Sequence, residues 1–80
     1  MFDWRGQITS DPAIAGGQPV FLGTRVTLRT VLASLAEGDR EADLLREFPT
    51  LTPDHVRAAI AFAAASAEED LPRPPLPKVA

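Results

Sequence analysis

The spacing of apolar residues changes near residue 27, and the change divides the chain into two kinds of structure. Before residue 27 the apolar residues stand in short groups between prolines and glycines. Such dense turn signals leave room only for very short strands. We therefore predict strands at residues 8–10 and 20–22, with Val26 extending a third. Gly23 is predicted to take a positive φ, because a tight turn must connect the second strand to Val26.

The N-terminal residues place two aromatic side chains at a spacing of two. Phe2 and Trp4 would share one face of a strand, and Ile8 continues that parity. We expect a short edge strand over residues 1–7 that covers the core. An exposed aromatic contact with a partner is the alternative.

After residue 27 the apolar period becomes helical. Apolar residues at i, i+3, i+4 and i+7 define one face of a helix, namely Leu28, Val31, Leu32 and Leu35. Thr27 is a suitable N-cap and Gly38 a suitable C-terminal stop. The pattern predicts a helix over residues 28–37.

Two further helices follow, separated by proline. Asp39 is the expected N-cap of a helix over residues 40–48, and Pro49 ends it, since the residue before a proline avoids the α region. The next helix begins at Thr52-Pro53, an N-cap followed by proline at the first helical position. It is expected to end near Glu68. Its many alanines reflect either helix propensity or a face for a helix–helix dimer contact.

The last residues have a different composition. Four prolines exclude a helix and a central strand from residues 71–80. One interpretation is a frayed terminus. The other is a stiff binding segment with apolar anchors and two cations, formed by Leu71, Leu76, Val79, Arg73 and Lys78.

These elements predict one mainly α domain of a helix-turn-helix type. An N-terminal β and turn element covers residues 1–27, a three-helix core covers residues 28–69, and a proline-rich tail covers residues 70–80. The chain has 80 residues and no cysteine that could form a disulfide, and so small a domain is marginally stable alone. We therefore expect a homodimer or another protein partner.

Charge and hydropathy exclude several classes of protein. The formal net charge is −3, and an acidic small protein binds DNA poorly without a concentrated basic face. No apolar run approaches the ~18 residues needed to span a bilayer. No basic segment followed by an apolar one indicates a signal peptide. We expect a cytoplasmic protein with no membrane association.

The sequence offers little for catalysis. His55 is the single histidine, and we interpret it as a surface residue near the start of the third helix. No zinc-protease, P-loop or serine-hydrolase motif occurs. We therefore expect no enzymatic activity, no metal site and no cofactor.

The turn between the last two helices allows a helix-turn-helix in which the third helix reads DNA. Residues near the start of such a helix contact base edges, and here His55 and Arg57 are the candidates. Arg25 and Arg29 are candidates for phosphate contacts. For Arg25, an ion pair with Asp11 is the favoured alternative.

A set of motifs spread over residues 4–66 is specific enough to compare with known families. The set consists of Trp4, Ile8, Asp11-Pro12, Gly17-Gln18-Pro19, Gly23-Thr24-Arg25-Val26, Gly38, Phe48-Pro49, Leu51-Thr52 and Ala58-Ala59. It resembles the bacterial family of unknown function DUF433, whose members are often described as VapB-type antitoxins. The resemblance implies a helix-turn-helix-like fold with a short β-containing N-terminus. It also implies a toxin–antitoxin role beside a PIN-like ribonuclease toxin.

We therefore predict a type II antitoxin that neutralises a PIN-like ribonuclease toxin through its tail. The expected toxin contacts are Leu71, Arg73, Leu76 and Lys78, with Arg73 suited to engage carboxylates of the nuclease. The helical body would bind operator DNA as a dimer. The alternatives are a stand-alone DNA-binding regulator and a dimerisation adaptor that binds no DNA.

Overall fold

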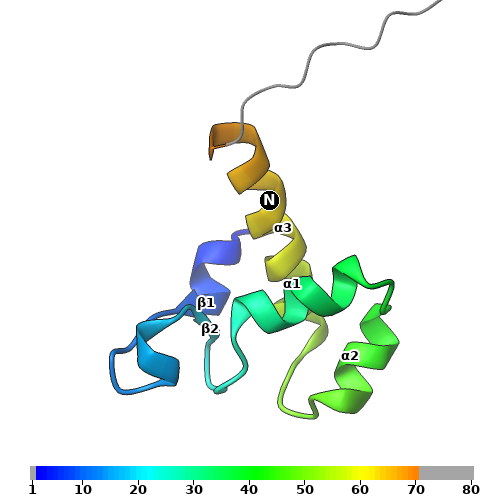
Figure 1. The fold of residues 1–80 in the computed structure, drawn as a ribbon, viewed down its shortest axis with the longest axis horizontal. Coiled ribbons are helices and arrows are strands. Elements are labelled where there is room, and N and C mark those ends of the chain that lie inside the picture. Colours follow the sequence, from blue (N-terminus) through cyan, green and yellow to red (C-terminus); the bar gives the residue numbers. More distant parts are fainter. Residues whose placement is uncertain (1, 71–80) are drawn as a thin grey trace, which may run out of the picture.

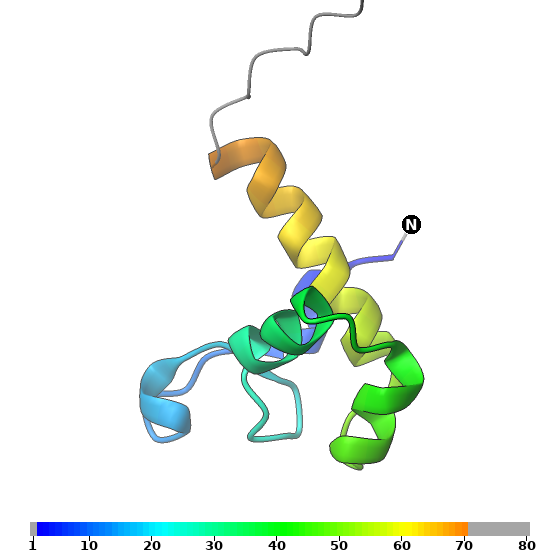
Figure 2. The ribbon, with the colours of Figure 1, turned by 45° about the vertical axis from the view of Figure 1, so that its right-hand side comes forward.

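The computed structural model describes residues 2–70, which form a small helical body with one long projecting helix (Figure 1). The elements in chain order are η1 (Trp4–Gln7), β1 (Ile8–Thr9), η2 (Ala15–Gly17), β2 (Val20–Phe21), α1 (Leu28–Ala36), α2 (Glu41–Glu47) and α3 (Pro53–Asp70), where η marks a 3-10 helix. The predicted class is confirmed, with three helices and a short two-stranded N-terminal sheet. α3 packs against α1, α2 and η1, and its C-terminal half runs beyond them (Figure 2).

The N-terminus differs from the predicted edge strand. Residues 4–7 form a 3-10 turn, and Asp3 caps it by accepting a hydrogen bond of 3.0 Å from the backbone N–H of Arg5. The turn places the Trp4 ring edge to face on Phe62 of α3, with ring centroids 5.2 Å apart. The edge-strand prediction is therefore wrong, and Trp4 packs against the last helix instead.

The strands are shorter than predicted. β1 and β2 pair antiparallel, with Ile8 opposite Phe21. No third strand forms within residues 2–70, where the segment after β2 adds only an isolated bridge between Thr27 and Val20. The carbonyl oxygen of Val26 accepts a hydrogen bond of 3.1 Å from the N–H of Phe21. The sheet is therefore a small hairpin against which the helices pack.

The turn after β2 has the backbone conformation that glycine favours. Gly23 has a φ of +80°, which confirms the predicted positive φ. The N–H of Thr24 donates to the carbonyl oxygen of Phe21 at 2.9 Å, and the N–H of Val26 donates to Thr24 Oγ1 at 3.1 Å. These bonds close the turn that leads from the hairpin towards α1.

α1 begins and ends within one residue of the prediction. Thr27 Oγ1 accepts a hydrogen bond of 3.3 Å from the backbone N–H of Thr30, as an N-cap does. At the other end, Gly38 (φ +104°) and Asp39 donate backbone hydrogen bonds to carbonyls of the last turn, both at 3.0 Å. This Schellman motif ends the helix at Ala36.

The same motif explains one wrong prediction. Asp39 is not the N-cap of α2, because its backbone N–H is bonded to the carbonyl oxygen of Ser34 in α1. α2 instead begins after Arg40, whose N–H donates to Asp43 Oδ2 at 2.8 Å. Asp43 also accepts a bond of 2.7 Å from the guanidinium of Arg46. One carboxylate thus stabilises both the start and the exposed side of this short helix.

α3 begins at Pro53 as predicted and continues to Asp70, past the expected end. The core lies where α1, α2 and the first turns of α3 meet β2. Its buried residues are Phe21, Leu28, Val31, Leu44, Leu51, Val56 and Ala59. Burying a large apolar side chain contributes about 1.5–3 kcal/mol, so this cluster is the main source of stability. The second half of α3 lies outside it.

Candidate functional site

The four residues predicted to contact DNA lie in different environments, and His55 differs most from the prediction. It is buried, with 6% of its surface exposed, so the expectation of a surface histidine is wrong. Its backbone N–H donates to Thr52 Oγ1 at 3.2 Å, and its Nδ1 accepts from the backbone N–H of Thr52, also at 3.2 Å. His55 thus completes a capping box at the start of α3, in the position usually taken by glutamate or glutamine.

The His55 ring is also held from the side of the hairpin. It lies tilted against the Phe21 ring, with centroids 5.3 Å apart, and it hydrogen-bonds the backbone of Leu22. Burial lowers the pKa of His55 below its ordinary value of 6.5, against the opposing effects of the Leu22 bond and the charge of Asp54. The ring therefore joins α3 to β2 and presents no edge to DNA.

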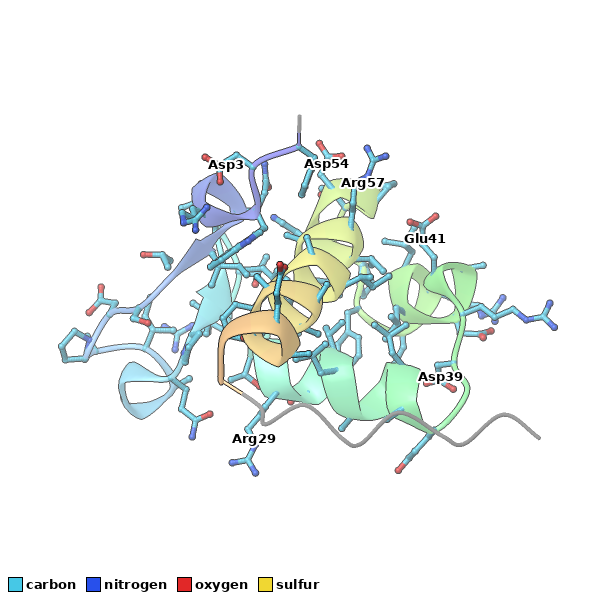
Figure 3. All side chains as sticks on the ribbon, turned by 90° about the horizontal axis from the view of Figure 1, so that it is seen from above. Asp3, Arg29, Asp39, Glu41, Asp54 and Arg57 are labelled. Carbon is cyan, nitrogen blue, oxygen red and sulfur yellow. The ribbon has the colours of Figure 1, made fainter. Side chains whose placement is uncertain are left out.

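Arg57 lies on the exposed side of α3, in surroundings of mixed charge. Its guanidinium carbon stands 5.2 Å from the centre of the Phe2 ring, which is a cation–π arrangement. Figure 3 shows Asp54 beside it and Asp3 along the same edge of the molecule. This edge of the molecule therefore presents the carboxylates of Asp3 and Asp54 together with Arg57, which disfavours docking on a phosphate backbone.

Arg29 projects from the other side of the molecule. It is exposed on the first turn of α1, and Figure 3 shows Arg29 and Arg57 on opposite edges. The structure therefore does not bring these two arginines onto one face. A contact surface that included both would have to wrap around the body.

Arg25 stands beside a depression near the hairpin. It is exposed, and together with Thr24 and Thr50 it lines a hollow of about 490 Å³. The expected ion pair with Asp11 is not present among residues 2–68. Asp11 instead accepts a hydrogen bond of 2.9 Å from the N–H of Ala13. Arg25 therefore keeps its charge at the surface.

A groove lies where the end of α1 and the starts of α2 and α3 converge. It has a volume of about 520 Å³ and is lined by Leu35, Glu41, Pro53, Asp54, Val56, Arg57 and Ile60. Ile60 has 55% of its surface exposed, which is high for a large apolar side chain. An apolar floor between charged side chains suits a peptide segment that is itself apolar and charged. The sequence did not predict this groove.

The described part of the chain offers no ligand set for a metal. Within it, no three His, Asp or Glu side chains gather closely enough to hold an ion. Among residues 2–70, no helix is both long enough and apolar enough to cross a membrane. The predicted toxin contacts, Leu71, Arg73, Leu76 and Lys78, lie outside the described residues.

Most of this chain is similar in sequence to part of a longer protein. The uncharacterized protein y4eO of Sinorhizobium fredii is 41% identical over 59 residues, which cover 74% of this chain and 27% of the relative. The chain thus spans only about a quarter of that relative's length.

A solved structure has the same fold. The crystal structure of a DUF433 member protein from Anabaena variabilis superposes with a TM-score of 0.68 at 28% identity, over 79% of this chain and 62% of that one. The family model described as "Protein of unknown function (DUF433)" matches residues 8–63. The chain therefore belongs to the DUF433 family, as its motifs predicted.

Proposed function

We propose that the chain is the antitoxin of a type II toxin–antitoxin pair and acts by binding a PIN-like ribonuclease. The observation that carries this proposal is the shape of α3, whose second half projects beyond the body and ends at Asp70 (Figures 1 and 2). In this proposal, the proline-rich residues after Asp70 form the contact with the toxin. The resemblance to VapB-type antitoxins points the same way.

The projecting half of α3 has a smooth surface that suits a contact with another chain. Ala61 and Ala65 lie one helical turn apart and are partly exposed. Alanine loses no side-chain entropy when it is covered, and it lets a second backbone approach closely. In the proposal, this surface forms the contact of a homodimer.

The predicted toxin contacts combine two kinds of interaction. Leu71 and Leu76 would supply apolar anchors, while Arg73 and Lys78 would supply positive charge. PIN-like nucleases bind their metal with clustered carboxylates, so a guanidinium can compete with that metal electrostatically. The antitoxin would then block the nuclease by occupying its site, and it would need no catalytic activity of its own.

DNA binding, in this proposal, depends on Arg25 and Arg29 rather than on the start of α3. Both are exposed cations near the first turn of α1, where the helix dipole also favours phosphate. His55 is buried, and Arg57 shares its edge of the molecule with acids. With a net charge of −3, a single chain offers few phosphate contacts, and a dimer would double them.

The test is co-expression of the chain with the product of the adjacent reading frame. The full chain should restore bacterial growth and should co-purify with that product. A variant truncated after Asp70 should fail in both assays and keep its helical circular dichroism. Arg29→Ala is the matched control, because it alters a DNA candidate and should neutralise the toxin as well as the wild type does.

Two results would contradict the proposal at different points. Full neutralisation by the truncated variant would show that the toxin contacts lie elsewhere than in the tail. A full chain that neither binds nor neutralises the adjacent product would contradict the antitoxin role itself.

A further inference from the structure

We propose that residues 71–80 fold back along α3 of the same chain and occupy the groove between α1, α2 and α3. This docking describes the chain without a toxin, and under the proposed function a toxin would displace the segment from the groove. Four features of the chain point to it: a stripe on α3 that leads to the groove, the length of the segment, its apolar side and its charge.

A continuous exposed stripe connects the groove to the far end of α3. Residues at i, i+3, i+7 and i+10 share one face of a helix. Arg57, Ile60, Ala64 and Ala67 stand in this relation, and all four are exposed. Beyond Ile60 the stripe consists of alanine, so it is flat enough for proline rings to pack on it at van der Waals distance.

The length of the segment matches the distance back to the groove. From Ile60 to Asp70, α3 rises about 15 Å at ~1.5 Å per residue. A polyproline chain advances ~3.1 Å per residue, so residues 71–75 would cover the same distance in the reverse direction. Leu76 would then lie beside Ile60, and residues 77–80 would lie in the groove.

The periodicity of a polyproline chain gives this segment an apolar side. With about three residues per turn, Arg73, Leu76 and Val79 share one face. Leu76 and Val79 would cover the groove floor made by Leu35 and Ile60. Docking would therefore remove from water an isoleucine that is 55% exposed in the described structure.

Charge complementarity favours this occupant over an acidic one. The groove carries the carboxylates of Glu41 and Asp54, while its arginine stands over an aromatic ring. The segment contains two cations, Arg73 and Lys78, and no acid. Lys78 falls within the part that would lie in the groove, so it would meet these two carboxylates. Figure 3 shows both of them beside the start of α3.

A spin-label experiment on the full chain tests the docking. The chain has no cysteine, so Ala80→Cys supplies a single site for a nitroxide. In an isotope-labelled sample, the amide signals of Arg57, Ile60 and Ala64 should broaden, whereas those of Ala15–Gly17 should not. Equal broadening of both groups, or no broadening of the first, would overturn the proposal.

A charge exchange and a mixing experiment complete the test. Glu41→Lys should abolish the broadening, and adding Lys78→Glu to it should restore the effect, with circular dichroism confirming that each variant is folded. Failure of the double variant to restore the broadening would refute the pairing in the groove. When labelled chains without nitroxide are mixed with unlabelled chains that carry it, the signals of Arg57, Ile60 and Ala64 should broaden less than in the first sample, because a nitroxide on a dimer partner lies farther away. Equal or stronger broadening in this mixture would overturn docking within one chain.

Discussion

Trp4 and Phe62 meet edge to face across the molecule, with ring centroids 5.2 Å apart and ring planes at 89°. One residue belongs to the 3-10 turn at the N-terminus and the other to α3. This contact packs the first residues of the chain against the projecting helix. Such aromatic pairs contribute about 0.5–1.5 kcal/mol beyond the burial of their area.

Phe62→Leu should therefore lower the free energy of unfolding by about 0.5–1.5 kcal/mol, since leucine keeps an apolar contact and loses the edge-to-face geometry. Trp4 is the only tryptophan, so its fluorescence during urea denaturation reports this contact directly. Leu22→Ala is a suitable control, because Leu22 is 55% exposed and should matter little. An unchanged midpoint for Phe62→Leu would contradict the assignment.

His55 should make stability depend on pH. Because burial lowers the pKa of His55 in the folded state, the unfolded chain, in which this pKa is about 6.5, binds the proton more readily. Above about pH 6.5 the ring is neutral in both states, and the free energy of unfolding has its full value. As the pH falls below this value the unfolded chain takes up the proton first, so the free energy of unfolding decreases until the pH is below the lower pKa of the folded state. Urea denaturation should show a decreasing free energy of unfolding between about pH 7.5 and about pH 5.

His55→Gln is the matched control for this pH dependence. Glutamine also serves at this position of a capping box, and it does not titrate. The variant should be less stable at neutral pH, because it loses the ring contact with Phe21. Its stability should stay constant over the same pH range. An equally steep dependence in the variant would mean that another group is responsible.

Gly23→Val should destabilise the protein by about 1–3 kcal/mol, because a β-branched residue is strained in the left-handed region. Gly23 has a φ of +80°, and no atom lies within 4 Å of the position that a Cβ would take. The cost therefore comes from the backbone and not from a clash. Gly23→Asn should cost less, since asparagine tolerates this conformation. Thermal unfolding of the three proteins provides the comparison, and equal midpoints would refute the turn's role.

Arg29→Ala should weaken binding to DNA of any sequence and lower the salt slope by about one, as expected for a lost phosphate contact. Arg57→Ala should leave the affinity unchanged, because its edge of the molecule carries acids. Titrations of upstream DNA at several salt concentrations measure both effects. If Arg57→Ala lowered the affinity for one DNA sequence and not for others, the start of α3 would be shown to contact the bases. No measurable binding by the wild type would favour the adaptor role.

The helices could be predicted because their signals act on nearby backbone. Thr27 and Gly38 bond to groups within a few residues of themselves, and Thr52 followed by Pro53 marks the start of α3. The prediction that Asp39 caps α2 failed for an equally local reason. Asp39 belongs to the Schellman motif that ends α1, so the N-cap of α2 is the next residue, Arg40.

The parts that could not be predicted depend on contacts between distant segments. The alternation of Phe2 and Trp4 fits a strand, but the fold of this segment is decided by the Asp3 cap and by Phe62. The groove gathers residues from three helices. The role of His55 was within reach, because its spacing from Thr52 is that of a capping box, with histidine in place of glutamate.

The meeting of the first turn with the last helix also determines when this chain can finish folding. A chain leaves the ribosome from its N-terminus, so Trp4 emerges well before Phe62. Contacts between segments so far apart along the chain form slowly, because a long loop must close first. Until α3 is synthesised, the hairpin also lacks the His55 ring that covers Phe21. Nascent chains of this protein should therefore stay open until synthesis has passed α3, and chains stopped earlier should be degraded rather than accumulate as a folded fragment.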